Sequence, residues 1–149
     1  MTLQQGLDRA LEVLGAAVRQ AEARRVVICF EPLAPSETNF INTAADAIQL
    51  ARRFGSKSMK IILDVKAMSA ESKPVPRIIR ESRGEFAYFH ANDRNLKGPG
   101  FGDVDFHPIG EALRDVGYDG YVSVEVFKYE EGPEAIATRS RDYLRKTVG

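Results

Sequence analysis

The chain has 149 residues, of which 44% are hydrophobic and 28% are charged, a composition typical of a soluble globular protein with a real core. Its 21 basic and 21 acidic residues balance, which excludes a nucleic-acid or membrane partner attracted by bulk charge. The single cysteine, Cys29, excludes a disulfide framework and favours a reducing, cytoplasmic compartment. No stretch reads as a signal peptide or as a membrane-spanning helix.

Hydrophobic periodicity and turn residues predict nine elements. Apolar residues spaced by three and four indicate an opening helix, and short β-branched apolar runs indicate strands. The predicted elements, in chain order, are a helix over 3–24, a strand over 26–31, a helix over 42–54, a strand over 59–64, a helix over 71–83, a strand over 86–90, a helix over 106–116, a strand over 121–127 and a helix over 133–147.

The order of these elements predicts an α/β fold. Strands that alternate with helices form parallel sheets with right-handed crossovers. The strands begin roughly 30 residues apart, and their near-continuous apolar character is typical of strands that are buried on both faces. We therefore expect one parallel four-stranded sheet.

Each predicted strand ends in, or close to, a side chain that can bind a metal. In α/β folds the carboxyl ends of the strands form the active face. The four residues at equivalent positions are Glu31, Asp64, His90 and Glu125. We expect them to lie together at one edge of the sheet.

Four stretches of the chain resemble the sugar phosphate isomerase/epimerase superfamily, whose members are xylose isomerase-like TIM barrels such as ketose 3-epimerases and hydroxypyruvate isomerases. The stretches are Glu31–Asn39, Leu63–Met68, His90–Asp93 and Gly117–Phe127. The resemblance implies that residues 1–149 form a single half-barrel domain, the parallel (β/α)4 unit with strands five to eight. A whole TIM barrel takes about 250 residues.

The resemblance also implies a site and a reaction. One divalent metal would be bound by Glu31, Asp64, His90 and Glu125, while Glu37 would contact the substrate. Oxygen and imidazole ligands favour Mn²⁺ and allow Mg²⁺, Co²⁺ or Zn²⁺. Glu31 and Glu125 would act as the acid/base pair that moves the proton next to the carbonyl of a small ketose or hydroxy-ketone, through an enediolate.

Two positions depart from the family pattern. Many epimerases have a histidine three residues after the metal-binding aspartate, where this chain has Ala67, and an arginine six residues after the metal-binding histidine, where it has Leu96. Arg94 and Lys97 lie near the second position. These departures leave the substrate open and allow an alternative, a catalytically inactive remnant or a binding protein of the same fold.

Further expectations concern partners and other residues. Half a barrel leaves two open sheet edges, so we expect a homodimer or an association with a separate N-terminal half-barrel. An apurinic endonuclease, which shares the barrel, would need a three-zinc site rich in histidine, whereas this chain has two histidines. His107 reads as a helix-start residue and Cys29 as a buried hydrophobe. The glycines between 98 and 102 favour a flexible active-site loop over a phosphate-binding loop.

Overall fold

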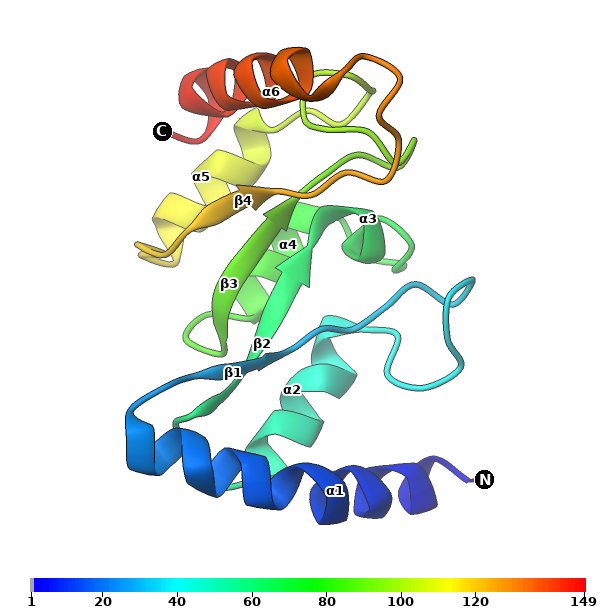
Figure 1. Ribbon diagram of the computed structural model, residues 1–149, viewed down its shortest axis with the longest axis vertical. Coiled ribbons are helices and arrows are strands. Elements are labelled where there is room, and N and C mark those ends of the chain that lie inside the picture. The colour runs from blue at the N-terminus through cyan, green and yellow to red at the C-terminus, as the bar shows by residue number, and fades with distance from the viewer. Residues whose placement is uncertain (1) are drawn as a thin grey trace.

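The computed structural model describes residues 2–149, and it has the α/β order that the sequence predicts (Figure 1). The elements are α1 (Leu3–Arg24), β1 (Ile28–Phe30), α2 (Ala44–Arg53), β2 (Met59–Asp64), α3 (Val65–Met68), α4 (Val75–Glu81), β3 (Phe86–Ala91), α5 (His107–Asp115), β4 (Val122–Val124) and α6 (Pro133–Thr147). The sheet is entirely parallel, in the order β1-β2-β3-β4.

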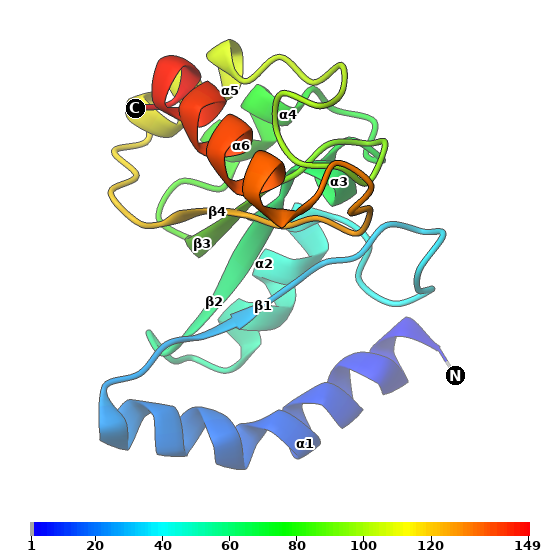
Figure 2. The same cartoon turned by 45° about the horizontal axis from the view of Figure 1, so that its top comes forward.

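Within residues 2–149, five helices lie outside the sheet, and the short α3 lies at the end of β2. Figures 1 and 2 show α2, α4 and α5 behind one face, with α1 beyond the β1 edge and α6 beyond the β4 edge. Surface ion pairs join neighbouring helices: Arg53 to Asp8 between α2 and α1 at 2.9 Å, and Arg80 to Asp115 between α4 and α5 at 2.7 Å. This arrangement is that of consecutive helices around part of a barrel.

The sheet is buried on its helix side and half-open on its other side. Alternate residues of β2 and β3 point to opposite faces, and those on the helix side form the core: Ile61, Leu63, Phe89 and Ala91. The residues between them, which include Ile62 and Tyr88, are only half-buried. The sequence-based expectation of burial on both faces is therefore wrong for this chain, because nothing in residues 2–149 covers the inner face fully.

Most elements lie within two residues of their predicted bounds at each end, but three are about half as long as predicted and one helix is added. The outer strands are shorter than predicted, because β1 and β4 each have a neighbour on one side only and pair over three residues. The helix predicted over 71–83 is reduced to α4, which begins directly after Pro74, since proline suits the start of a helix and not its interior. A short helix, α3, begins directly after β2 and was not predicted.

The glycine-containing loop before α5 is packed and not open. A side chain at Gly98 would clash with Ser140 of α6, and one at Gly102 would clash with Asp93. The loop therefore rests on α6 and on the segment after β3, which differs from the flexible loop expected from its composition. No helix in residues 2–149 is long and apolar enough to cross a membrane.

Candidate metal centre

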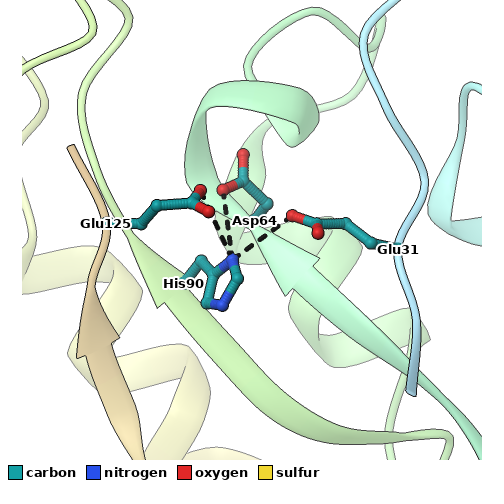
Figure 3. A group of neighbouring side chains, drawn as sticks. All are labelled: Glu31, Asp64, His90 and Glu125. Carbon is teal, nitrogen blue, oxygen red and sulfur yellow. Dashed lines mark hydrogen bonds and ion pairs between the residues drawn. The ribbon is translucent and has the colours of Figure 1, made fainter. Parts of the chain in front are cut away.

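The structure brings together the four residues at the strand ends. Asp64 is the last residue of β2 and His90 lies in β3, while Glu31 and Glu125 come directly after β1 and β4. One ligand atom from each residue lies within 4.8 Å of the other three. Figure 3 shows His90 and Asp64 in the middle of the group, with the two glutamates facing each other from either side.

The register of the sheet explains how four strands bring their residues to one point. Asp64 pairs with His90. Continuing the β1–β2 register puts Glu31 level with Ile62, two residues before Asp64, and continuing the β3–β4 register puts Glu125 level with Asn92, two residues after His90. A (β/α)8 barrel with shear 8 advances about one residue per strand. The four cluster residues therefore lie at a similar height along the barrel axis. Because the offsets between neighbouring strands are two, zero and two residues, all four side chains lie on the inner face.

His90 is surrounded by carboxylates. Its Nδ1 lies 3.2 Å from Oε1 of Glu31, 3.4 Å from Oε2 of Glu125 and 3.9 Å from Oδ2 of Asp64. Nδ1 can donate one hydrogen, so it cannot satisfy three carboxylates. The group holds three acidic side chains against one imidazole, and a divalent cation would offset most of this negative charge.

Burial and neighbouring charges shift the pKa values of the cluster. The hydrogen bond with Glu31, assisted by the other two carboxylates, raises the pKa of His90 above its ordinary value. Burial raises the pKa of Asp64, which is 2% exposed, and also that of Glu125. All three shifts favour proton uptake by the metal-free folded protein.

We therefore expect the stability of the metal-free protein to fall as pH rises. The stabilisation from protonated His90 is complete below the ordinary imidazole pKa, about 6.5, and is lost as pH rises through the raised value. The raised pKa values of the two acids act in the same direction from about pH 4 upward, because the folded state binds more protons than the unfolded state. The melting temperature with chelator present should be lower at pH 8 than at pH 6.

The histidine part of this pH dependence can be isolated by substitution. His90→Gln should flatten the change between pH 6 and pH 8, because it removes the imidazole that the three carboxylates surround. A melting temperature that rises from pH 6 to pH 8 in chelated wild-type protein would contradict the expectation.

Asn92 holds the cluster in place, and sequence reasoning missed it. The side chain is fully buried. Its amide donates to Oδ2 of Asp64 at 2.5 Å and to Oε2 of Glu125 at 3.3 Å, and its Oδ1 accepts from the backbone N–H of Lys66 at 2.7 Å. The sequence position of Asn92 is a signal for this role, because a residue two positions after His90 points to the same face of an extended chain as His90 does.

Asn92→Leu should weaken metal binding by about 10- to 100-fold, the usual cost of removing a partner that orients a ligand. It should also destabilise the fold by about 1–3 kcal/mol, since the buried N–H of Lys66 loses its acceptor. Calorimetric titration with Mn²⁺ and urea unfolding measure the two effects. Metal affinity equal to that of the wild type in a folded variant would contradict this role.

The remaining predicted residues lie around the cluster. Glu37 is not in it: its Oε1 accepts from Nζ of Lys66 at 2.8 Å and its Oε2 accepts from the backbone N–H of Ala34 at 3.2 Å. Ala67 is buried in α3, and its N–H donates to Asp64. Cys29 is half-buried in β1, and burial raises the pKa of its thiol, as expected of a residue that is not reactive.

The donor set suits a hard or borderline divalent cation. Three carboxylates and one imidazole are ligands that Mn²⁺, Mg²⁺, Co²⁺ and Zn²⁺ accept in proteins. The atoms already lie close enough for one ion to contact all four residues after small side-chain adjustments. Metal binding by these residues and the choice among metals stay predictions.

The fold and the cluster define half of an α/β barrel whose chemistry-bearing side chains gather at the carboxyl ends of its strands. The family model described as xylose isomerase-like TIM barrel matches residues 2–147, and the chain belongs to this family.

Several relatives are epimerases. The chain is 32% identical over 120 residues to a D-psicose 3-epimerase of Ruminiclostridium cellulolyticum, a match that covers 80% of this chain and 41% of the relative. It is 31% identical to a 3-dehydro-D-guloside 4-epimerase of Escherichia coli, covering 97% of this chain and 57% of the relative. The crystal structure of a D-psicose 3-epimerase in the presence of D-fructose superposes with a TM-score of 0.90 at 25% identity, covering 100% of this chain and 58% of that one.

The chain therefore spans 41% to 58% of the length of these relatives. That share fits half of a barrel and confirms the predicted fold class and family.

Proposed function

We propose that the chain is the metal-binding half of a sugar epimerase that acts next to the carbonyl of a ketose. The observation that carries the proposal is the convergence of Glu31, Asp64, His90 and Glu125, with one ligand atom of each within 4.8 Å of the others. The relatives' names support the reaction class, since they include D-psicose 3-epimerases and an L-ribulose 3-epimerase.

In this proposal the four residues hold one divalent ion, for which we prefer Mn²⁺. When bound, the ion supplies Lewis-acid polarisation of the substrate's carbonyl and adjacent hydroxyl oxygens, which makes the neighbouring C–H bond more acidic.

The two glutamates carry the proton transfer. Glu31 and Glu125 face each other across the cluster (Figure 3), so a substrate bound between them would present one face to each. One carboxylate removes the proton from the carbon next to the carbonyl, and the other, in its protonated form, returns a proton to the opposite face. The carbon is inverted, and exchange with solvent restores the two carboxyl groups for the next turnover. Asp64 and Asn92 hold the cluster residues in position and take no part in the transfer of the substrate's proton.

The reaction is tested by solvent exchange. D-Psicose and D-fructose are incubated with the chain in D₂O, with Mn²⁺ or with chelator, and the carbon next to the carbonyl is followed by NMR. Deuterium incorporation that needs Mn²⁺ supports the proposal. A folded, Mn²⁺-binding sample that incorporates none with a wider panel of ketoses would favour the alternative, an inactive remnant or binding protein.

We further propose that another barrel half covers the open sheet, either a second copy of this chain or a separate N-terminal half-barrel. β1 and β4 are edge strands, and exposed apolar side chains gather beside them: Val26, Val27, Tyr121, Val124 and Phe127. Unpaired edges with apolar neighbours associate readily.

The molar mass tests this association. Light scattering on the purified chain should give an assembly larger than the 16.5 kDa of one chain. If mixing with an N-terminal half-barrel is needed to obtain a defined assembly, the second copy is excluded. A monodisperse species of 16.5 kDa, unchanged by such mixing, would contradict the association.

A further inference from the structure

A pocket is lined by residues that follow the four cluster residues along the chain by two to six positions. Its volume is about 440 Å³, and it is mostly apolar, with Ala34, Ala70 and Leu96 among its lining residues. Every segment that follows a cluster residue contributes to its wall, and the charged or aromatic side chains among them are Glu37, Lys66, Arg94 and Phe127. Because these segments continue outward from the cluster, a substrate whose reacting carbon lies at the cluster would extend into this pocket.

One of the two cations in the pocket wall is already neutralised. Nζ of Lys66 lies 2.8 Å from Oε1 of Glu37 and 4.3 Å from the ring centre of Phe127. Its side chain is only 13% exposed, so it is held between three segments of the wall. The Lys66–Glu37 pair contributes no net charge to the pocket.

Arg94 is the second cation of the pocket wall. Within residues 2–149 its guanidinium makes no ion pair and no hydrogen bond, whereas the nearby Lys97 pairs with Glu131 and Arg139 stacks on Phe101. Arg94 lines the pocket, so the pocket carries a net positive charge. Arg94 is exposed to solvent, so its guanidinium is free to meet a ligand at the pocket. A guanidinium is suited to bind a carboxylate or a phosphate through two parallel hydrogen bonds.

The turn that carries Arg94 is rigid. The N–H of Leu96 donates to the carbonyl of Asp93, and the N–H of Asp93 donates to the carbonyl of Lys97. The carbonyl of Leu96 accepts from both Phe127 and Lys128, which ties the turn to the segment after β4. Leu96 has φ = 72°, a left-handed conformation that a leucine rarely adopts. Strain of this kind persists where the surrounding structure fixes it, and it occurs at binding sites.

We propose that the substrate of the epimerase site carries an anionic group, a carboxylate or a phosphate, at the end of the sugar remote from the reacting carbon, and that Arg94 binds this group. The inference rests on the function proposed above for the cluster. Lys66 lines the same subsite and, through its pair with Glu37, keeps the wall beside Arg94 in place.

The test uses three ligands that differ only at carbon 6: D-fructose, D-fructuronate and D-fructose 6-phosphate. Their dissociation constants are measured by calorimetry at low and physiological salt, once with the Mn²⁺-loaded chain and once with the chelator-treated chain. At least one anionic sugar should bind about 10-fold or more tightly than D-fructose, and Arg94→Gln should remove this difference. Arg83→Gln, an equal change of charge at an exposed arginine far from the pocket, should preserve it.

The outcomes separate this inference from the proposed function. A preference for D-fructuronate alone identifies a carboxylate, and a preference for D-fructose 6-phosphate alone identifies a phosphate; both support the inference. Equal binding of all three sugars, or an equal loss in Arg83→Gln, overturns it, even if Mn²⁺ binding and proton exchange are observed. An Arg94-dependent preference in chelator-treated protein would uphold it even if no proton exchange occurs.

Discussion

Glu125→Gln should reduce Mn²⁺ affinity by about 100-fold or more and abolish any proton exchange on a ketose. The substitution keeps the size of the side chain and removes the negative charge that a divalent ion attracts. It also removes one of the two carboxylates proposed to move the proton, and the loss of a general acid or base alone costs about 10²–10⁴ in rate. Calorimetric titration of chelator-stripped protein measures the affinity, and NMR measures the exchange.

Two comparisons make this result specific. Glu111→Gln makes the same change on the exposed surface of α5 and should leave metal binding as in the wild type. Metal binding and exchange are read separately, because a variant that still binds Mn²⁺ but exchanges no proton places Glu125 in the proton transfer alone. Wild-type values of both in Glu125→Gln would exclude this residue from the site.

Phe89→Ala should lower the free energy of unfolding by about 3–5 kcal/mol, the usual cost of removing a buried aromatic ring. Phe89 is fully buried in β3, between Leu63 of β2 and Val122 of β4, and its ring lies on the helix side of the sheet. A loss of this size is a large part of the stability of an ordinary domain.

Urea unfolding followed by circular dichroism measures this loss. It should be run with chelator and at several protein concentrations, because metal binding and association both change apparent stability. Val13→Ala, at a position of α1 that is 65% exposed, should change stability by less than about 0.5 kcal/mol. A loss below about 1 kcal/mol in Phe89→Ala would show that the core on the helix side is not closely packed around this ring.

The parts of the fold that follow from local pattern were predictable from the sequence. β2 was predicted with its observed bounds, because its apolar run is bounded by turn residues on one side and by Asp64 on the other. The gathering of Asp64 and His90 follows from the rule that parallel strands end on the same side of a sheet.

Other features depend on tertiary contacts that no local pattern reports. The short helix α3 forms because the side chain of Asp64 accepts a hydrogen bond from the N–H of Ala67 and caps the helix. The sequence indicates Asp64 as a metal ligand, and its second role as a helix cap depends on this contact. The role of Asn92 depends on its contacts with two other strands. The half-open inner face depends on what packs against the sheet in three dimensions, which a run of apolar residues cannot reveal.

The two glutamates have a consequence for local unfolding. Glu31 follows β1 and Glu125 follows β4, which are the outermost strands of the sheet and pair over only three residues each. Short edge strands open locally at a lower free energy than the core of a sheet. An ion held by both glutamates would be released by opening at either edge, so by mass action it would protect the backbone amides of both edges against hydrogen exchange. Metal binding would then couple the local opening of β1 to that of β4, although these two strands share no hydrogen bond.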